Sequence, residues 1–126
     1  MKVARFQDLL VWQRSMDLAR AVSAIDGAGG LQRDRSLRDQ LTQAALSVAS
    51  NIAEGFGQQT DRAFAAHLHI ALGSNYEVAT QLRIAYDRGY ITRREFDEAV
   101  ALCDETGRML TDLIHYLRRS DRRLRG

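Results

Sequence analysis

Apolar side chains recur every three or four positions along almost the whole chain, which is the period of an α-helix. No stretch alternates apolar and polar residues convincingly, as a half-buried β-strand would. Short turn-rich segments such as DGAGG, at residues 26–30, separate the periodic stretches. The pattern therefore predicts four helices, at about residues 6–25, 34–55, 61–88 and 93–117.

The third and fourth predicted helices each carry a continuous apolar stripe whose steps alternate between four and three residues. In the third helix the stripe consists of Phe64, Leu68, Ala71, Asn75, Val78, Leu82 and Ala85. In the fourth helix it consists of Phe96, Val100, Cys103, Gly107, Leu110, Ile114 and Leu117. Long helices joined by short links are expected to run antiparallel to their neighbours. The expected fold is all-α: a single-domain up-down-up-down four-helix bundle over residues 1–117, followed by an arginine-rich C-terminal tail at residues 118–126.

The stretch SNIAEGFGQQTD, residues 50–61, joins the second and third predicted helices. Either Gly55 or Gly57 is expected to take the left-handed conformation that closes many helices. Thr60 and Asp61 are expected to cap the helix that follows. A phosphate-binding loop is the weaker interpretation, because no strand precedes the glycines and the lysine of that motif is missing. We therefore interpret this stretch as a turn between antiparallel helices.

The link between the third and fourth predicted helices carries two specific signals. Gly89 is expected to end the third helix, since glycine is common just after a helix. Thr92 and Glu95 have the spacing of a capping box, in which each side chain bonds the backbone N–H of the other residue. The fourth helix should therefore begin at about residue 93.

The second and third predicted helices carry more apolar surface than one bundle core needs. On the third helix the additional stripe consists of Leu72, Tyr76, Ala79 and Tyr86. We expect these residues to form an interface between copies of the chain in a homo-oligomer. The alternative is a monomer in which the third helix is buried on several sides.

Composition limits where such a protein can act. The chain has 126 residues, of which 45% are hydrophobic and 27% charged, as in ordinary globular domains. No apolar run approaches the roughly 18 residues that a membrane span needs, and no signal-peptide apolar region is expected near the start. The single cysteine, Cys103, cannot form an internal disulfide, which agrees with a reducing compartment. We expect a cytoplasmic protein without a membrane partner.

Positive charge is concentrated at the C-terminal end. The tail sequence RRSDRRLRG has five arginines and one aspartate, a net charge of +4, so the other 117 residues together carry −2 of the total of +2. The candidate nucleic-acid-binding residues are Arg118, Arg119, Arg122, Arg123 and Arg125. Arginine binds phosphate through two parallel hydrogen bonds and releases counterions from nucleic acid. The alternative is a solubilising end without a ligand.

The sequence offers no convincing catalytic or metal-binding motif. His67 and His69 are two residues apart on one helix, so they point in nearly opposite directions and cannot hold one metal ion together. Cys103 falls on the apolar stripe of the fourth helix, where an inert thiol is expected. A polar group around Asn51 and Glu54 fits either a hydrogen-bonded structural layer or an acid–base site, and we favour the layer. We expect no cofactor, no metal and no enzymatic activity.

Three segments resemble the four-helix-bundle family of the 23S rRNA intervening-sequence proteins. They are FQDLLVWQRSMDL, SNIAEGFGQQTDRAFAAHLHIALGSNYEVATQL and GYITRREFDEAVALCDETGRMLTDLI. The resemblance implies a left-handed bundle, five copies of which assemble as a ring. It extends in fold to the accessory protein of diversity-generating retroelements, a basic pentamer that binds nucleic acid and a reverse transcriptase. The resemblance thus implies an RNA-related or ribosome-related role.

The family's signature positions fall on residues whose implied role is packing and turn geometry. They are Trp12, Asn51, Glu54, Gly55, Gly57, Gly73 and Ser74. The sequence departs from the family at Ala49, where proline is usual, and at Gln58 and Gln59, where basic residues are usual. These departures leave the tail as the main source of positive charge.

Taken together, these patterns lead us to expect a non-enzymatic, homo-oligomeric bundle whose arginine tail binds RNA or DNA phosphates. The alternative is a protein–protein scaffold without nucleic-acid binding, in which the spare surface of the second and third helices contacts another protein.

Overall fold

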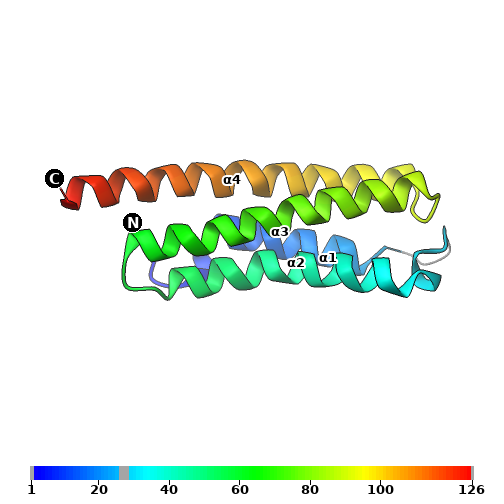
Figure 1. Ribbon diagram of the computed structural model, residues 1–126, viewed down its shortest axis with the longest axis horizontal. Helices are drawn as coiled ribbons and strands as arrows, with labels where there is room; N and C mark the ends of the chain where they lie inside the picture. The colour runs from blue at the N-terminus through cyan, green and yellow to red at the C-terminus, as the bar shows by residue number, and fades with distance from the viewer. Residues whose placement is uncertain (1, 26–28, 126) are drawn as a thin grey trace.

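The structure, a computed structural model, describes residues 2–25 and 29–125, with side chains up to Arg122. Four long helices form an antiparallel bundle, and the described residues contain no β-strand (Figure 1). The elements are the 3-10 turn η1 (Phe6–Asp8), α1 (Leu10–Ser23), the 3-10 turn η3 (Leu31–Arg33), α2 (Arg35–Phe56), α3 (Asp61–Asp87) and α4 (Arg93–Arg125). The predicted all-α four-helix bundle is confirmed.

Each helix packs against two neighbours around a closed square. α2 contacts α3, α3 contacts α4, and α1 lies against both α2 and α4. α4 is the longest helix, and its red C-terminal end extends past the start of α3 (Figure 1). The end of α4 is therefore packed along one side and open to solvent on others.

The observed helix ends match the sequence prediction closely at α2 and α3 and differ at the two ends of the chain. The first helix was expected from residue 6, but Leu9 is extended (φ −70°, ψ 123°) and separates the turn η1 from α1. The fourth was expected to end at residue 117, but α4 continues to Arg125. The arginine tail is therefore a continuation of the last helix.

The turn between α2 and α3 corrects one expectation. Neither Gly55 nor Gly57 is left-handed: α2 runs through Gly55, and Gly57 follows it at φ −76° and ψ −5°. A Cβ on Gly55 would lie 2.8 Å from the Cβ of His67 and 2.9 Å from Cδ1 of Phe64. Glycine is needed here because α2 and α3 approach closely. The cap is confirmed, since the Thr60 hydroxyl accepts from the Ala63 N–H at 3.1 Å.

The link between α3 and α4 agrees with its sequence signals. Gly89 has a left-handed φ of 73°, as expected for a residue that ends a helix. The Glu95 carboxylate accepts from the Thr92 N–H at 2.8 Å, and the Thr92 hydroxyl accepts from the Glu95 N–H at 3.1 Å. This reciprocal capping box fixes the first turn of α4.

The core consists of two apolar clusters, one toward each end of the bundle. Near the middle of the bundle, the buried Asn75 donates from Nδ2 to the Cys103 carbonyl at 2.9 Å. The Cys103 thiol donates to the Asn75 carbonyl at 3.2 Å. Gly107 leaves room for this contact, because a Cβ there would lie 3.1 Å from the amide nitrogen. Asn75 thus joins α3 to α4 by hydrogen bonds.

No helix in the described part of the chain is both long enough and apolar enough to cross a membrane.

Candidate functional site

The arginines of the last turns of α4 lie on the open end of the bundle. Arg118, Arg119 and Arg122 are exposed. The side chains of Arg123 and Arg125 lie outside those that the structure describes, although both residues belong to α4. Arg118, Arg119 and Arg122 therefore form a positive surface on consecutive turns of α4.

A groove of about 450 Å³ lies between the start of α3 and the end of α4, and we call it the terminal groove. It is lined by Asp61, Arg62, Ala65, Ala66 and His69 of α3 and by Leu117, Arg118, Asp121 and Arg122 of α4. The buried Ala65 and Leu117 contribute apolar surface, and the charged side chains surround it. The groove thus combines cations from two helices that are far apart in sequence.

One hydrogen bond crosses the terminal groove. Nη2 of Arg118 lies 2.7 Å from Nε2 of His69. A guanidinium group can only donate, so Nε2 of His69 must accept and carries no proton. The bond positions the Arg118 side chain beside α3 while its other N–H groups remain available.

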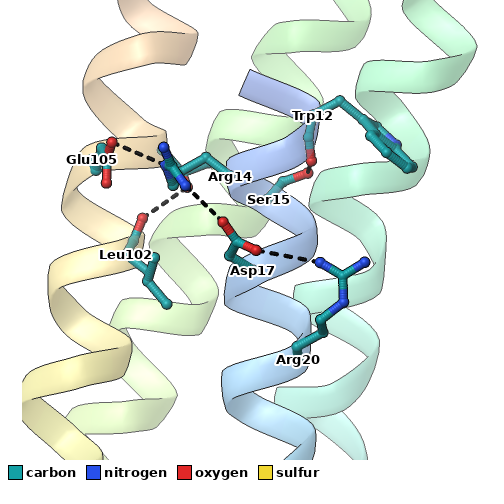
Figure 2. A network of polar contacts seen from close by, with 8 residues as sticks. Trp12, Arg14, Ser15, Asp17, Arg20, Leu102 and Glu105 are labelled. Carbon is teal, nitrogen blue, oxygen red and sulfur yellow. Dashed lines mark hydrogen bonds and ion pairs between the residues drawn. The ribbon is translucent and has the colours of Figure 1, made fainter. Parts of the chain in front are cut away.

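Most of the other arginines with described contacts are paired with carboxylates. The paired residues are Arg14, Arg20, Arg38, Arg83, Arg88, Arg93 and Arg94. Figure 2 shows one such group, in which Arg14 contacts Asp17 at 2.7 Å and Glu105 of α4 at 3.0 Å. The hydrogen bond to Asp17 and the charge of Glu105 raise the pKa of Arg14.

The arginines of the terminal groove differ from that pattern. Within the described residues, neither Arg62, Arg118 nor Arg122 forms an ion pair, and the neighbouring Arg119 forms none. Their charge is therefore not neutralised by a direct carboxylate contact and can attract an anion from solution.

The predicted oligomer-interface residues lie in different environments. Tyr76 is 60% exposed and borders a second groove of about 420 Å³ between α3 and α4, which also includes Gly107 and Arg108. Leu72, Ala79 and Tyr86 are partly buried against the chain's own core. Tyr86 stacks on Phe96 at 4.7 Å between ring centroids. The interface stays a prediction, with Tyr76 as its accessible member.

The polar group on α2 and α3 forms a hydrogen-bonded layer. The hydroxyls of Ser47 and Ser74 are 2.8 Å apart, and the Asn51 amide donates to the Ser47 carbonyl at 2.9 Å. Glu54 is not buried: its side chain is 66% exposed, with Oε2 4.0 Å from Nε2 of His67. These contacts support the structural layer and leave no buried carboxylate at Glu54 for acid–base chemistry.

The remaining signature residues have mixed surroundings. Trp12 meets Phe6 edge-on at 5.2 Å between centroids, which closes the apolar cluster at one end of the bundle. Gly55 permits close helix contact, as described above. Gly73 is exposed, with no atom within 4 Å of a Cβ placed there, and nothing in the structure explains the choice of glycine at this position.

Neither a metal site nor a reactive thiol is evident in the described part of the chain. No group of three or more His, Cys, Asp or Glu residues there lies close enough to hold a metal ion. Burial, with a smaller contribution from the charge of Asp104, raises the pKa of Cys103 to about 11. The thiol is therefore protonated and unreactive at neutral pH.

Sequence reasoning identified the arginines of α4 but missed the α3 side of the terminal groove. Arg62, Ala66 and His69 follow one another at steps of four and three, so they lie on one side of a helix. Antiparallel pairing of the last two helices places the start of α3 beside the end of α4. These two facts, read together, could have indicated the groove.

The fold defines an all-α bundle protein in which Arg118, Arg119 and Arg122 of α4 form no ion pair within the described residues. The model of the 23S rRNA-intervening sequence protein family matches residues 7–112, and this chain belongs to that family. The match ends before Arg118, the first arginine of the C-terminal cluster.

A solved structure has the same fold: a protein of unknown function from the S23 ribosomal protein family of Bacteroides thetaiotaomicron VPI-5482. It is 24% identical, with a TM-score of 0.76, and the alignment covers 83% of this chain and 98% of that one. A comparison with curated proteins gave no match.

Proposed function

We propose that this chain is a non-enzymatic, cytoplasmic protein that binds the phosphate backbone of RNA or DNA through the arginines at the end of α4. The observation that carries the proposal is the absence of ion pairs at Arg118, Arg119 and Arg122 within the described residues, on a helix that projects beyond its neighbour. Arginine contacts to phosphates depend on the charge of the nucleic-acid backbone and not on the base sequence. They therefore contribute affinity and little sequence specificity. The family's description, which refers to an rRNA intervening sequence, is consistent with a nucleic-acid ligand.

We further propose that the protein acts as a homo-oligomer, in the ring of five that the family resemblance implies. The accessible Tyr76 and the groove beside it supply a surface suited to a second copy. A ring would bring several arginine-rich helix ends together, and linked sites raise overall affinity without improving any single contact.

The test is a fluorescence-anisotropy titration of a labelled RNA hairpin and a DNA duplex at about 50 mM salt. The full-length protein is compared with a variant in which Arg118, Arg119 and Arg122 are replaced by glutamine. Glutamine keeps the helix propensity while removing three charges. We expect the variant to bind at least about 100-fold more weakly, because each charged hydrogen bond is worth about 1.5–3 kcal/mol. Equal binding by both proteins would contradict the proposal.

A protein–protein scaffold is the second candidate, and the exposed Tyr76 favours it. In that case the triple glutamine variant and the wild type would give the same result in the RNA and DNA titration. Binding of the protein partner would depend on the groove around Tyr76. The two candidates therefore differ in which surface a substitution must change.

A further inference from the structure

We propose that the terminal groove is a phosphodiester-binding site, built jointly by Arg62 and His69 of α3 and by Arg118 and Arg122 of α4. The inference rests on the proposed function, since it takes the nucleic-acid backbone as the ligand. It adds a defined place for one phosphate group and assigns residues of α3, 49 or more positions before the tail, to the same site.

The charge of the groove favours an anion. Three arginines are opposed by Asp61 and Asp121, and His69 is neutral while it accepts the Arg118 bond. The lining residues therefore carry a net charge of +1. A phosphodiester carries one negative charge, which the net positive charge of the lining attracts.

The shape of the groove suits a phosphate attached to a sugar. Its volume of about 450 Å³ exceeds what a bare phosphate would fill and lies in the range of small-ligand sites. Ala65, Ala66 and Leu117 offer small apolar surface on which the carbon atoms of a ribose can pack. The arginines at the margin can then reach the phosphate oxygens with paired N–H groups.

His69 is a positioning residue in this site. It accepts a single N–H of Arg118 at 2.7 Å, which leaves the remaining donors of the guanidinium for the ligand. Holding a long side chain in place beforehand reduces the entropy lost on binding. The replacement His69→Gln keeps a hydrogen-bond acceptor, whereas His69→Leu removes it, so the glutamine variant should retain more affinity than the leucine variant.

The decisive experiment compares Arg62→Ala with Arg35→Ala, using a labelled single-stranded RNA of about 12 nucleotides. Arg62 and Arg35 are both exposed and form no ion pair within the described residues, but only Arg62 lines the terminal groove, and Arg35 lies at the start of α2. We expect Arg62→Ala to weaken binding about tenfold and to lower the slope of log K against log salt by about 0.7, the value for one contact to a single strand. Arg35→Ala should stay within about twofold of the wild type.

Ala66→Glu serves as a second variant, since Ala66 is exposed and the new carboxylate would enter the groove without disturbing the core. It should weaken RNA binding at least as much as Arg62→Ala, with an unchanged thermal unfolding curve. If the wild type binds RNA but Arg62→Ala and Arg35→Ala behave alike, the groove assignment is wrong and the proposed function stands. If the wild type does not bind RNA at low salt, both are wrong.

Competition identifies the class of phosphate. A dinucleotide with one internal phosphodiester should displace the labelled RNA at about tenfold lower concentration than a nucleoside monophosphate, because it has a sugar on each side of the phosphate to pack on the apolar surface, and inorganic phosphate should be weakest. Equal displacement by the monophosphate would overturn the assignment to a phosphodiester.

Discussion

The buried contact between Asn75 and Cys103 shows how single residues fix the pairing of α3 with α4. The Asn75 amide and the Cys103 thiol each donate to a carbonyl oxygen of the opposite helix. In this register Gly107 leaves space for the Asn75 amide, which a slide by one turn would move away from the glycine. Leaving the buried amide unsatisfied would cost about 1–3 kcal/mol. The bond therefore specifies register as well as adding stability.

Burial of the Cys103 thiol leads to a pH-dependent stability. Its pKa in the folded chain is raised from 9.0 to about 11, mainly because burial disfavours the thiolate. The stability that the neutral Cys103 thiol contributes to the fold is fully present below pH 9. It is lost as pH rises toward 11, because the Cys103 thiol loses its proton at a lower pH in the unfolded chain than in the folded chain.

Urea unfolding of the wild type and of Cys103→Ala, at intervals from pH 7 to pH 11, measures this effect. The difference in unfolding free energy between the two proteins should be constant up to about pH 8.5. Above that pH the unfolding free energy of the wild type should fall relative to that of Cys103→Ala, by up to about 3 kcal/mol. Comparison at each pH cancels the titration of shared tyrosines. A difference that stays flat to pH 11 would contradict the raised pKa.

At the scale of the elements, helix boundaries were predictable where local chemistry sets them. Thr60 caps α3, and Thr92 with Glu95 caps α4, because each cap depends on side chains within three residues of the helix start. The continuation of α4 to Arg125 was harder to predict, since a run of arginines resembles a solvated tail. Arginine nevertheless has good helix propensity, and no proline or glycine interrupts the run before Gly126.

Gly55 was misread because its role depends on another helix. Sequence spacing suggested a left-handed helix end, whereas the structure shows a helical residue against His67 and Phe64. Close approach of two backbones is a property of the packed bundle, so local patterns do not reveal it. The same limit concealed the α3 side of the terminal groove.

Two glycine-to-alanine substitutions test this account of helix packing. Gly55→Ala should destabilise the fold by about 1–3 kcal/mol, because the new methyl group would lie 2.8 Å from the Cβ of His67. Gly73→Ala is the matched control, since it lies within α3 with open space around it. It should stabilise the fold by about 0.5–1 kcal/mol through helix propensity.

Chemical unfolding at one pH measures both variants under the same conditions. Stabilisation by Gly55→Ala would show that α2 and α3 do not need the close contact.

At the scale of the whole molecule, Tyr76 gives the prediction of self-association a specific test. It is the most exposed of the large apolar side chains that the structure describes, and it faces solvent beside the groove between α3 and α4. Tyr76→Asp would place a charge in a buried interface, which strongly disfavours association.

Analytical ultracentrifugation at several concentrations should show an oligomer for the wild type and a smaller species for Tyr76→Asp. Ile70→Asp is a suitable control, because Ile70 is similarly exposed and does not line that groove. A wild-type monomer at all concentrations would contradict self-association. Equal disruption by both variants would place the interface elsewhere on α3.

The overall architecture was predictable because every element shows the same 3.6-residue period and the links are short. The candidate site was predictable only in part. Clustered charge identified Arg118 and Arg122, whereas Arg62 and His69 became candidates once the packing of α3 beside α4 was known.

The salt dependence of RNA binding tests the central claim most directly. The association constant of the wild type and of the triple variant Arg118→Gln, Arg119→Gln, Arg122→Gln is measured between about 50 and 200 mM salt. If these arginines contact backbone phosphates, the wild type should lose at least about tenfold in affinity over this range, with a slope steeper than that of the variant by about two to three. Identical slopes for the two proteins, or no wild-type binding at about 50 mM salt, would contradict the claim.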